Sequence, residues 1–159
     1  MADSTLIQEF HSDHAQVVQA LLDLRRSVQA RQPDGVRATL DNTNKLVGPH
    51  FKFEELHLYP KLREFVGEGG MHRLLAEHDG IFRSVAALAK LASKDSWTDA
   101  EAANAEAYLD LIWEHPISCD GLSLYIERLP AAVQAALLNE MNAMRRQGTT
   151  LLDYRKERN

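Results

Sequence analysis

The sequence predicts an all-α protein, an up-down-up-down four-helix bundle with a short C-terminal fifth helix. Its 159 residues fit a single domain, taken here as residues 1–159. The chain holds 22 Leu and 20 Ala, which favour helices, against 8 Gly and 5 Pro, which break them. The breakers gather in a few places, so long helices should be joined by short loops, as in an antiparallel bundle.

The first two helices are bounded by turn residues. The first is expected from about Ser12 to Ala30, where leucines and valines repeat at helical spacing. It ends at Gln32-Pro33-Asp34-Gly35, a sequence typical of a turn. The second is expected from about Val36 to Val66, before the glycines of residues 67–70. Gly48-Pro49 within it predicts a kink just before the next residue.

The later helices carry start signals. A third helix is expected from about Met71 to Ala92. Thr98-Asp99-Ala100-Glu101 is a capping box, in which the Thr and Glu side chains bond to backbone amides, so a fourth helix should begin at Thr98 and last to about Leu129. Pro130 fits the first turn of the short fifth helix, Ala131 to about Arg146.

Charge and cysteine content restrict the classes of function. The formal net charge is −5, and the basic stretches Arg145-Arg146 and Arg155–Arg158 are interpreted as solvated helix ends, so no nucleic-acid partner is expected. The single cysteine, Cys119, excludes an intramolecular disulfide and a Cys-only zinc site. No apolar run approaches the ~20 residues that span a membrane. Since Met1–Thr5 also lacks the features of a signal peptide, we expect a cytoplasmic protein without membrane contact.

Histidines occur on each of the four predicted long helices. The seven are His11, His14, His50, His57, His72, His78 and His115. Apolar residues at helical spacing surround His14 and His78, so both should face the bundle interior. Buried ionisable groups are costly unless they are paired or bind a metal. His11 and His72 are interpreted as surface residues.

Two of these histidines have a carboxylate nearby in the chain. His50 and Glu54 are four residues apart, about 40° on a helix, and could share one metal ion; a solvated pair is the alternative. Asp120 follows His115 by five residues, about 140° on a straight helix. Pro116 predicts a distortion, such as a π-bulge, that would rotate Asp120 towards the face of His115. Otherwise Asp120 marks a helix end. Imidazole and carboxylate together suit iron.

In their order and spacing these residues resemble the hemerythrin-like family, the HHE cation-binding domains. The matching segments are His14, His50…Glu54, the acidic-then-aromatic-Pro segment Glu55-Leu56-His57-Leu58-Tyr59-Pro60, Glu77-His78-Asp79 and His115…Asp120. The resemblance implies a four-helix bundle around a non-haem di-iron centre. Glu54 and Asp120 would bridge the irons, with His14 and His50 on one iron and His78 and His115 on the other.

One position departs from the pattern of that family, and two further features need their own interpretation. Its oxygen carriers have a second histidine four residues before the one matching His78, where this chain has Leu74. Glu55, His57 or water could fill that coordination position, and the iron of His78 and His115 should be held more weakly. Glu54-Glu55-Leu56-His57 also reads as E-x-x-H, a ferritin-like signature, but the chain has no second copy. Cys119, where some members place a glutamate ligand, is interpreted as buried and inert, with thiolate ligation as the alternative.

Three functions remain open at this point. The resemblance implies a protein that binds or senses O2, or that handles NO or iron. An enzyme that turns over peroxide or nitric oxide could use the same site, with Glu55 and Asp79 as nearby acids. A metal-free bundle could instead serve as an interaction module.

Overall fold

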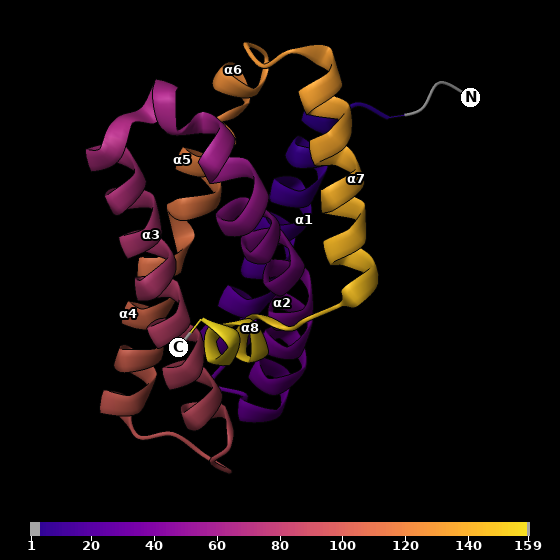
Figure 1. Ribbon diagram of the computed structural model, residues 1–159. Coiled ribbons are helices and arrows are strands. Elements are labelled where there is room, and N and C mark those ends of the chain that lie inside the picture. Colours follow the sequence, from indigo (N-terminus) through magenta and orange to yellow (C-terminus); the bar gives the residue numbers. More distant parts are fainter. Residues whose placement is uncertain (1–3, 159) are drawn as a thin grey trace.

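Four helical columns pack side by side in the computed structural model, which describes residues 4–158 (Figure 1). The columns are α1 (Leu6–Gln29), α2 (Pro33–Phe53), the second half of α3 (Tyr59–Ala92), and α4 (Asp99–Trp113) followed by α5 (His115–Asp120). Each column contacts its neighbours, and the described residues contain no strand. The predicted all-α bundle is confirmed; residues 1–3 and 159 of the predicted domain lie outside the described part.

Helix starts follow local capping chemistry. The predicted capping box is confirmed, since the Thr98 amide donates to Glu101 Oε2 at 2.9 Å and the Glu101 amide donates to Thr98 Oγ1 at 3.2 Å. A second capping box, Thr5 with Gln8, starts α1 earlier than predicted. Helix α2 also starts early, because Pro33 fits the first helical turn.

The second predicted helix contains a π-helical turn, η1 (Glu54–Leu58), and continues into the first part of α3. The Tyr59 amide donates to the carbonyl oxygen of Glu54, five residues earlier. A kink was expected at Gly48-Pro49, but the helix runs on through Pro49 and its hydrogen bonding changes only at Glu54. The first part of α3 ends where the second predicted helix was expected to end. The reason is that Gly67 has φ 74° and ψ 166°, a conformation that essentially only glycine adopts.

The predicted fourth helix, to Leu129, is three helices. Helix α4 ends before Glu114, α5 follows it, and α6 (Ser123–Ile126) comes after a turn. Pro116 favours the break, because its missing amide and its ring fit the first turn of a new helix and disturb the hydrogen bonding of a continuing one. The expected distortion is present, but it takes the form of a break before His115.

The two C-terminal helices lie outside the four columns. Helix α7 (Ala131–Gln147) is the predicted fifth helix and packs along α1 and α2, and α8 (Leu151–Glu157), which was not predicted, packs on α2 and α3 (Figure 1). A Cβ on Gly48 would lie within 3.0 Å of backbone atoms of Thr149 and Leu151. Glycine at this position therefore allows the chain entering α8 to approach α2 closely.

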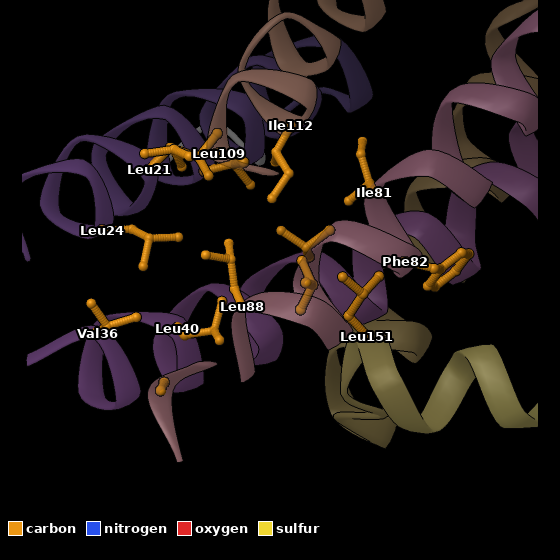
Figure 2. Packing of buried hydrophobic residues seen from close by; sticks show 14 of the residues in the cluster. Leu21, Leu24, Val36, Leu40, Ile81, Phe82, Leu88, Leu109, Ile112 and Leu151 are labelled. Atoms are coloured by element: carbon orange, nitrogen blue, oxygen red, sulfur yellow. The ribbon is translucent and has the colours of Figure 1, made fainter. Parts of the chain in front are cut away.

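Two apolar clusters fill the bundle towards its opposite ends. Figure 2 shows part of the first cluster, with Leu21, Leu24, Leu88 and Leu109 directed into the space between the helices. The second cluster includes Phe10, Phe53, Leu62 and Ile126. In each column a buried histidine lies between the two clusters: His14 between Phe10 and Val17, His50 between Val47 and Phe53, His78 between Leu74 and Ile81, and His115 between Ile112 and Cys119. The bundle thus contains one polar layer. In residues 4–158 no helix has the length and apolar character needed to cross a membrane.

Candidate metal centre

The polar layer brings together five of the six residues expected to bind metal. His14, His50, His78, His115 and Glu54 are buried, and His78 and Glu54 are completely so. Their donor atoms form two groups, in each of which all atoms lie within 4.8 Å of one another. The groups are His14, His50, Glu54 and Cys119, and Glu54, His78 and His115. Glu54 belongs to both.

The Glu54 carboxylate lies between two pairs of histidines. Its Oε1 is 3.0 Å from His50 Nε2 and 4.0 Å from His14 Nε2, and its Oε2 is 3.2 Å from His78 Nε2. The Nε2 atoms are 3.1 Å apart in the pair His14–His50 and 3.0 Å apart in the pair His78–His115. A carboxylate with one oxygen towards each pair has the arrangement that bridges two ions.

The other ring nitrogen of every histidine in the layer contacts a carboxylate. The Nδ1 distances are 3.0 Å from His14 to Asp120, 3.1 Å from His50 to Asp13, 2.7 Å from His78 to Glu55 and 2.8 Å from His115 to Glu77. Metal-binding histidines almost always have such a partner, which fixes the ring with its free nitrogen towards the ion. All four rings are held with Nε2 pointing into the centre.

The centre contains more hydrogen-bond acceptor atoms than hydrogens to donate to them. A neutral histidine that donates Nδ1–H to a carboxylate can only accept at Nε2. Four such nitrogens and the Glu54 carboxylate converge, and without protons or cations between them their burial would be costly. Imidazole nitrogen and carboxylate oxygen are donors that iron and zinc accept. The residues therefore fit a pair of metal ions.

The pKa values describe how protons are shared among the same groups. Burial opposes charge on His50, but Glu54 and Asp13 outweigh burial and raise its pKa to about 10. Burial and the positive charge of His50 lower the pKa of His14 to about 4. In the second pair, hydrogen bonds to Glu54 and Glu55 overcome burial and raise the pKa of His78, whereas burial lowers that of His115. In each pair one histidine has a raised pKa and the other a lowered one, and protons and metal ions would compete for these nitrogens.

Asp120 departs from the bridging position expected for it. Its Oδ1 contacts His14 Nδ1 at 3.0 Å and His11 Nδ1 at 2.7 Å, on the partly exposed rim of the layer. The helix is regular from His115 to Asp120, so the two side chains remain about 140° apart. The distortion that was expected between them takes the form of a break before His115, and the π-helical turn lies elsewhere, at η1. Asp120 orients His14 and lies outside both donor groups.

Cys119, interpreted from the sequence as inert, lies in the centre. It follows His115 by four residues, so both side chains project from the same face of α5. Its thiol is fully buried and donates to Glu54 Oε1 at 2.7 Å. The same four-residue spacing is the sequence feature that left thiolate ligation open as the alternative.

Tyr59 also points into the centre, where no ligand was expected from it. Its hydroxyl donates to Glu54 Oε2 at 3.3 Å and lies 3.1 Å from His78 Nε2. The π-helical turn places Tyr59, five residues after Glu54, on the same face as Glu54. Leu74, where the family pattern has a histidine, is buried in the second apolar cluster.

The substitutes expected for that missing histidine lie elsewhere. His57 is partly exposed, with its Nε2 3.6 Å from a Glu140 oxygen. Glu55 contacts the outer nitrogen of His78. His72 is exposed, as predicted. His11 is exposed too, but it contacts Asp120.

Arginines of the C-terminal segment support the outer carboxylates. Arg145 of α7 donates to Asp13 at 2.6 Å and to Glu9 at 2.7 Å. The interpretation of Arg145 as a solvated helix end is wrong, because α7 packs along α1 and the guanidinium reaches the carboxylate behind His50.

Arg158 has the corresponding role behind His78. It follows α8 and donates to Glu55 at 2.8 Å and to Asp79 at 2.7 Å, while the Tyr154 hydroxyl donates to Glu55 at 2.8 Å. The expectation of a solvated residue is wrong here as well, because α8 folds back onto α2 and α3. Neither Glu55 nor Asp79 is a free acid beside the metal centre.

A small cavity adjoins the centre. Its volume is about 20 Å³, and its walls are apolar except for Thr43 and three of the histidines, His14, His50 and His115. A cavity of roughly 10–15 Å³ is needed to hold one water molecule. The space therefore suits a single molecule of very few atoms.

Comparison with models of known protein families gives a match. The Hemerythrin HHE cation binding domain matches residues 5–115, a segment that contains the four histidines of the layer and Glu54. Cys119, Asp120, α7 and α8 lie beyond it. No curated protein and no solved structure matches the chain.

Proposed function

Since the chain belongs to the Hemerythrin HHE cation binding domain family, we propose that its polar layer holds two iron ions and that the protein binds O2 or NO beside them. His14 and His50 would hold one ion, His78 and His115 the other, and Glu54 both. The observation that carries the proposal is the paired geometry, in which each histidine pair faces one Glu54 oxygen and each outer nitrogen contacts a carboxylate.

Bound iron would supply an exchangeable position at which a small molecule binds. The chain itself contributes orientation and shielding. Carboxylates on the rim fix the four rings, and the two apolar clusters keep bulk water from the layer. The cavity of about 20 Å³ supports a diatomic ligand over a larger one, because it holds little more than one water-sized molecule.

Turnover of peroxide or nitric oxide is the second candidate, and one observation favours it. The Tyr59 hydroxyl lies inside the layer, 3.1 Å from His78 Nε2, where it can hold a proton for a molecule bound nearby. If the protein is an enzyme, peroxide or nitric-oxide turnover by iron-loaded protein should fall in Tyr59→Phe. If it is a carrier or sensor, reduced protein should change its spectrum reversibly with O2 or NO, without turnover.

Metal analysis of aerobically purified protein tests the iron site. Two irons per chain and a near-ultraviolet charge-transfer band are expected. The double variant His50→Ala/Glu54→Ala should lose most of the iron, whereas His72→Ala, which alters an exposed histidine, should keep it. Wild-type iron content in the double variant would refute the ligand assignment. Absence of metal, with no effect of chelator on stability, would favour the metal-free interaction module.

A further inference from the structure

The two halves of the polar layer do not have the same donors. Cys119 Sγ lies within 4.8 Å of the donor atoms of His14, His50 and Glu54, but it is not in the group formed by Glu54, His78 and His115. The sulfur therefore belongs to one half of the centre. It is 2.7 Å from Glu54 Oε1, the same oxygen that faces His50.

The course of the chain around Cys119 directs its side chain inward. Because α5 restarts at His115, the residue four positions later shares its face, and the residue five positions later turns to the rim. Cys119 is fully buried, and its polar neighbours are Glu54 at 2.7 Å and the Tyr59 hydroxyl at 4.0 Å, both of which belong to the centre. The thiol faces possible metal-binding atoms of three other residues. A cysteine that only fills space in an apolar core would be surrounded by apolar side chains instead.

We propose that Cys119 is a thiolate ligand of the ion held by His14 and His50. This inference rests on the proposed function, since it needs an ion between these residues. On binding, the thiol proton leaves to solvent and a sulfur–metal bond replaces the S–H bond, with no change of oxidation state. One ion then has two nitrogens, one oxygen and one sulfur, a four-donor set that suits thiophilic ions, and the other has nitrogen and oxygen donors only.

Cobalt(II) titration of the full chain stripped of metal tests this assignment. Cobalt(II) bound to a thiolate gives near-ultraviolet charge-transfer absorption that nitrogen and oxygen donors alone do not give. The band should saturate at one cobalt per chain, although two cobalt ions bind in total. Cys119→Ser should lose the band and keep its helical circular dichroism, because serine retains a small group that can donate to Glu54.

Two matched variants distinguish the halves of the centre. His14→Ala, on the sulfur side, should lose the band, whereas His115→Ala, on the opposite side, should keep it. Two bound cobalt ions without the band in the wild type would overturn the thiolate assignment and leave the proposed metal centre intact. A band that persists in His14→Ala at wild-type intensity would also overturn it. If the wild-type chain binds no cobalt, iron or zinc, the proposed function fails, and this inference fails with it.

Discussion

Replacing Gly48 with alanine should displace α8 and weaken the support of the metal centre. The added Cβ would lie within 3.0 Å of the Thr149 oxygen, the Thr150 carbonyl carbon and the Leu151 nitrogen. All three are backbone atoms, so no side-chain rotation relieves the contact. Either the chain entering α8 shifts while α8 stays docked, or α8 separates from α2.

The two outcomes bracket the expected loss of stability. A shift of well-packed neighbours costs about 1–3 kcal/mol, and the clash with rigid backbone places this case near the upper value. Separation of α8 exposes Leu151 and Tyr154, which are 0% and 3% exposed, at about 1.5–3 kcal/mol for each side chain. The higher helix propensity of alanine stabilises the folded protein by roughly 1 kcal/mol and offsets part of this loss. We therefore expect the free energy of unfolding to fall by about 2–5 kcal/mol.

Urea unfolding monitored by circular dichroism measures this loss, and Gly80→Ala is the matched control. Gly80 also lies within a helix, but its Cβ would meet only the end of the Arg83 side chain at 4.0 Å. That variant should gain about 0.4–1 kcal/mol. If Gly48→Ala proves as stable as Gly80→Ala, the close approach of α8 is refuted.

Retention of bound metal is the second measurement on Gly48→Ala. Helix α8 positions Tyr154 and Arg158 against Glu55, which in turn contacts His78. The variant should therefore lose bound metal to a chelator faster than Gly80→Ala does. Unchanged retention in a destabilised Gly48→Ala would show that α8 contributes to stability alone.

Three further substitutions test separate parts of the same reasoning. Gly67→Ala should lower the free energy of unfolding in urea by about 1–3 kcal/mol, because φ of 74° and ψ of 166° are strained for any residue with a Cβ; wild-type stability would contradict this. Phe51→Ala should cost about 3–5 kcal/mol in the same assay, since Phe51 is 2% exposed and stacks on the His78 ring at 3.6 Å; a loss below 1 kcal/mol would contradict it. Arg158→Gln should lower metal affinity roughly 10–100-fold in chelator competition by removing the cation that holds Glu55; affinity equal to wild type would assign Arg158 no part in positioning His78.

The sequence by itself was sufficient for the features that depend on spacing within one helix. Each residue of an α-helix advances about 100°, so apolar periodicity predicted the bundle and placed His14 and His78 inside it. The same geometry paired His50 with Glu54. Caps and breakers are also local, which is why the Thr98 capping box and the reversal at Gly67 were predictable.

Other features were decided only when the helices packed. The break before His115, and not after it, determines that Cys119 faces the centre while Asp120 lies on the rim. The π-helical turn that brings Tyr59 into contact with Glu54 adds one residue to a helical turn, and no pattern in the sequence predicted it.

Contacts between distant segments depended on packing in the same way. Asp13 of α1 contacts His50 of the neighbouring helix α2. Arg145 and Arg158 reach the outer carboxylates only because α7 and α8 fold back onto the bundle. Helical periodicity determines which face of each helix is buried. It does not determine which side chain of a neighbouring helix that face will meet, because this depends on the axial shift and rotation adopted when the helices pack.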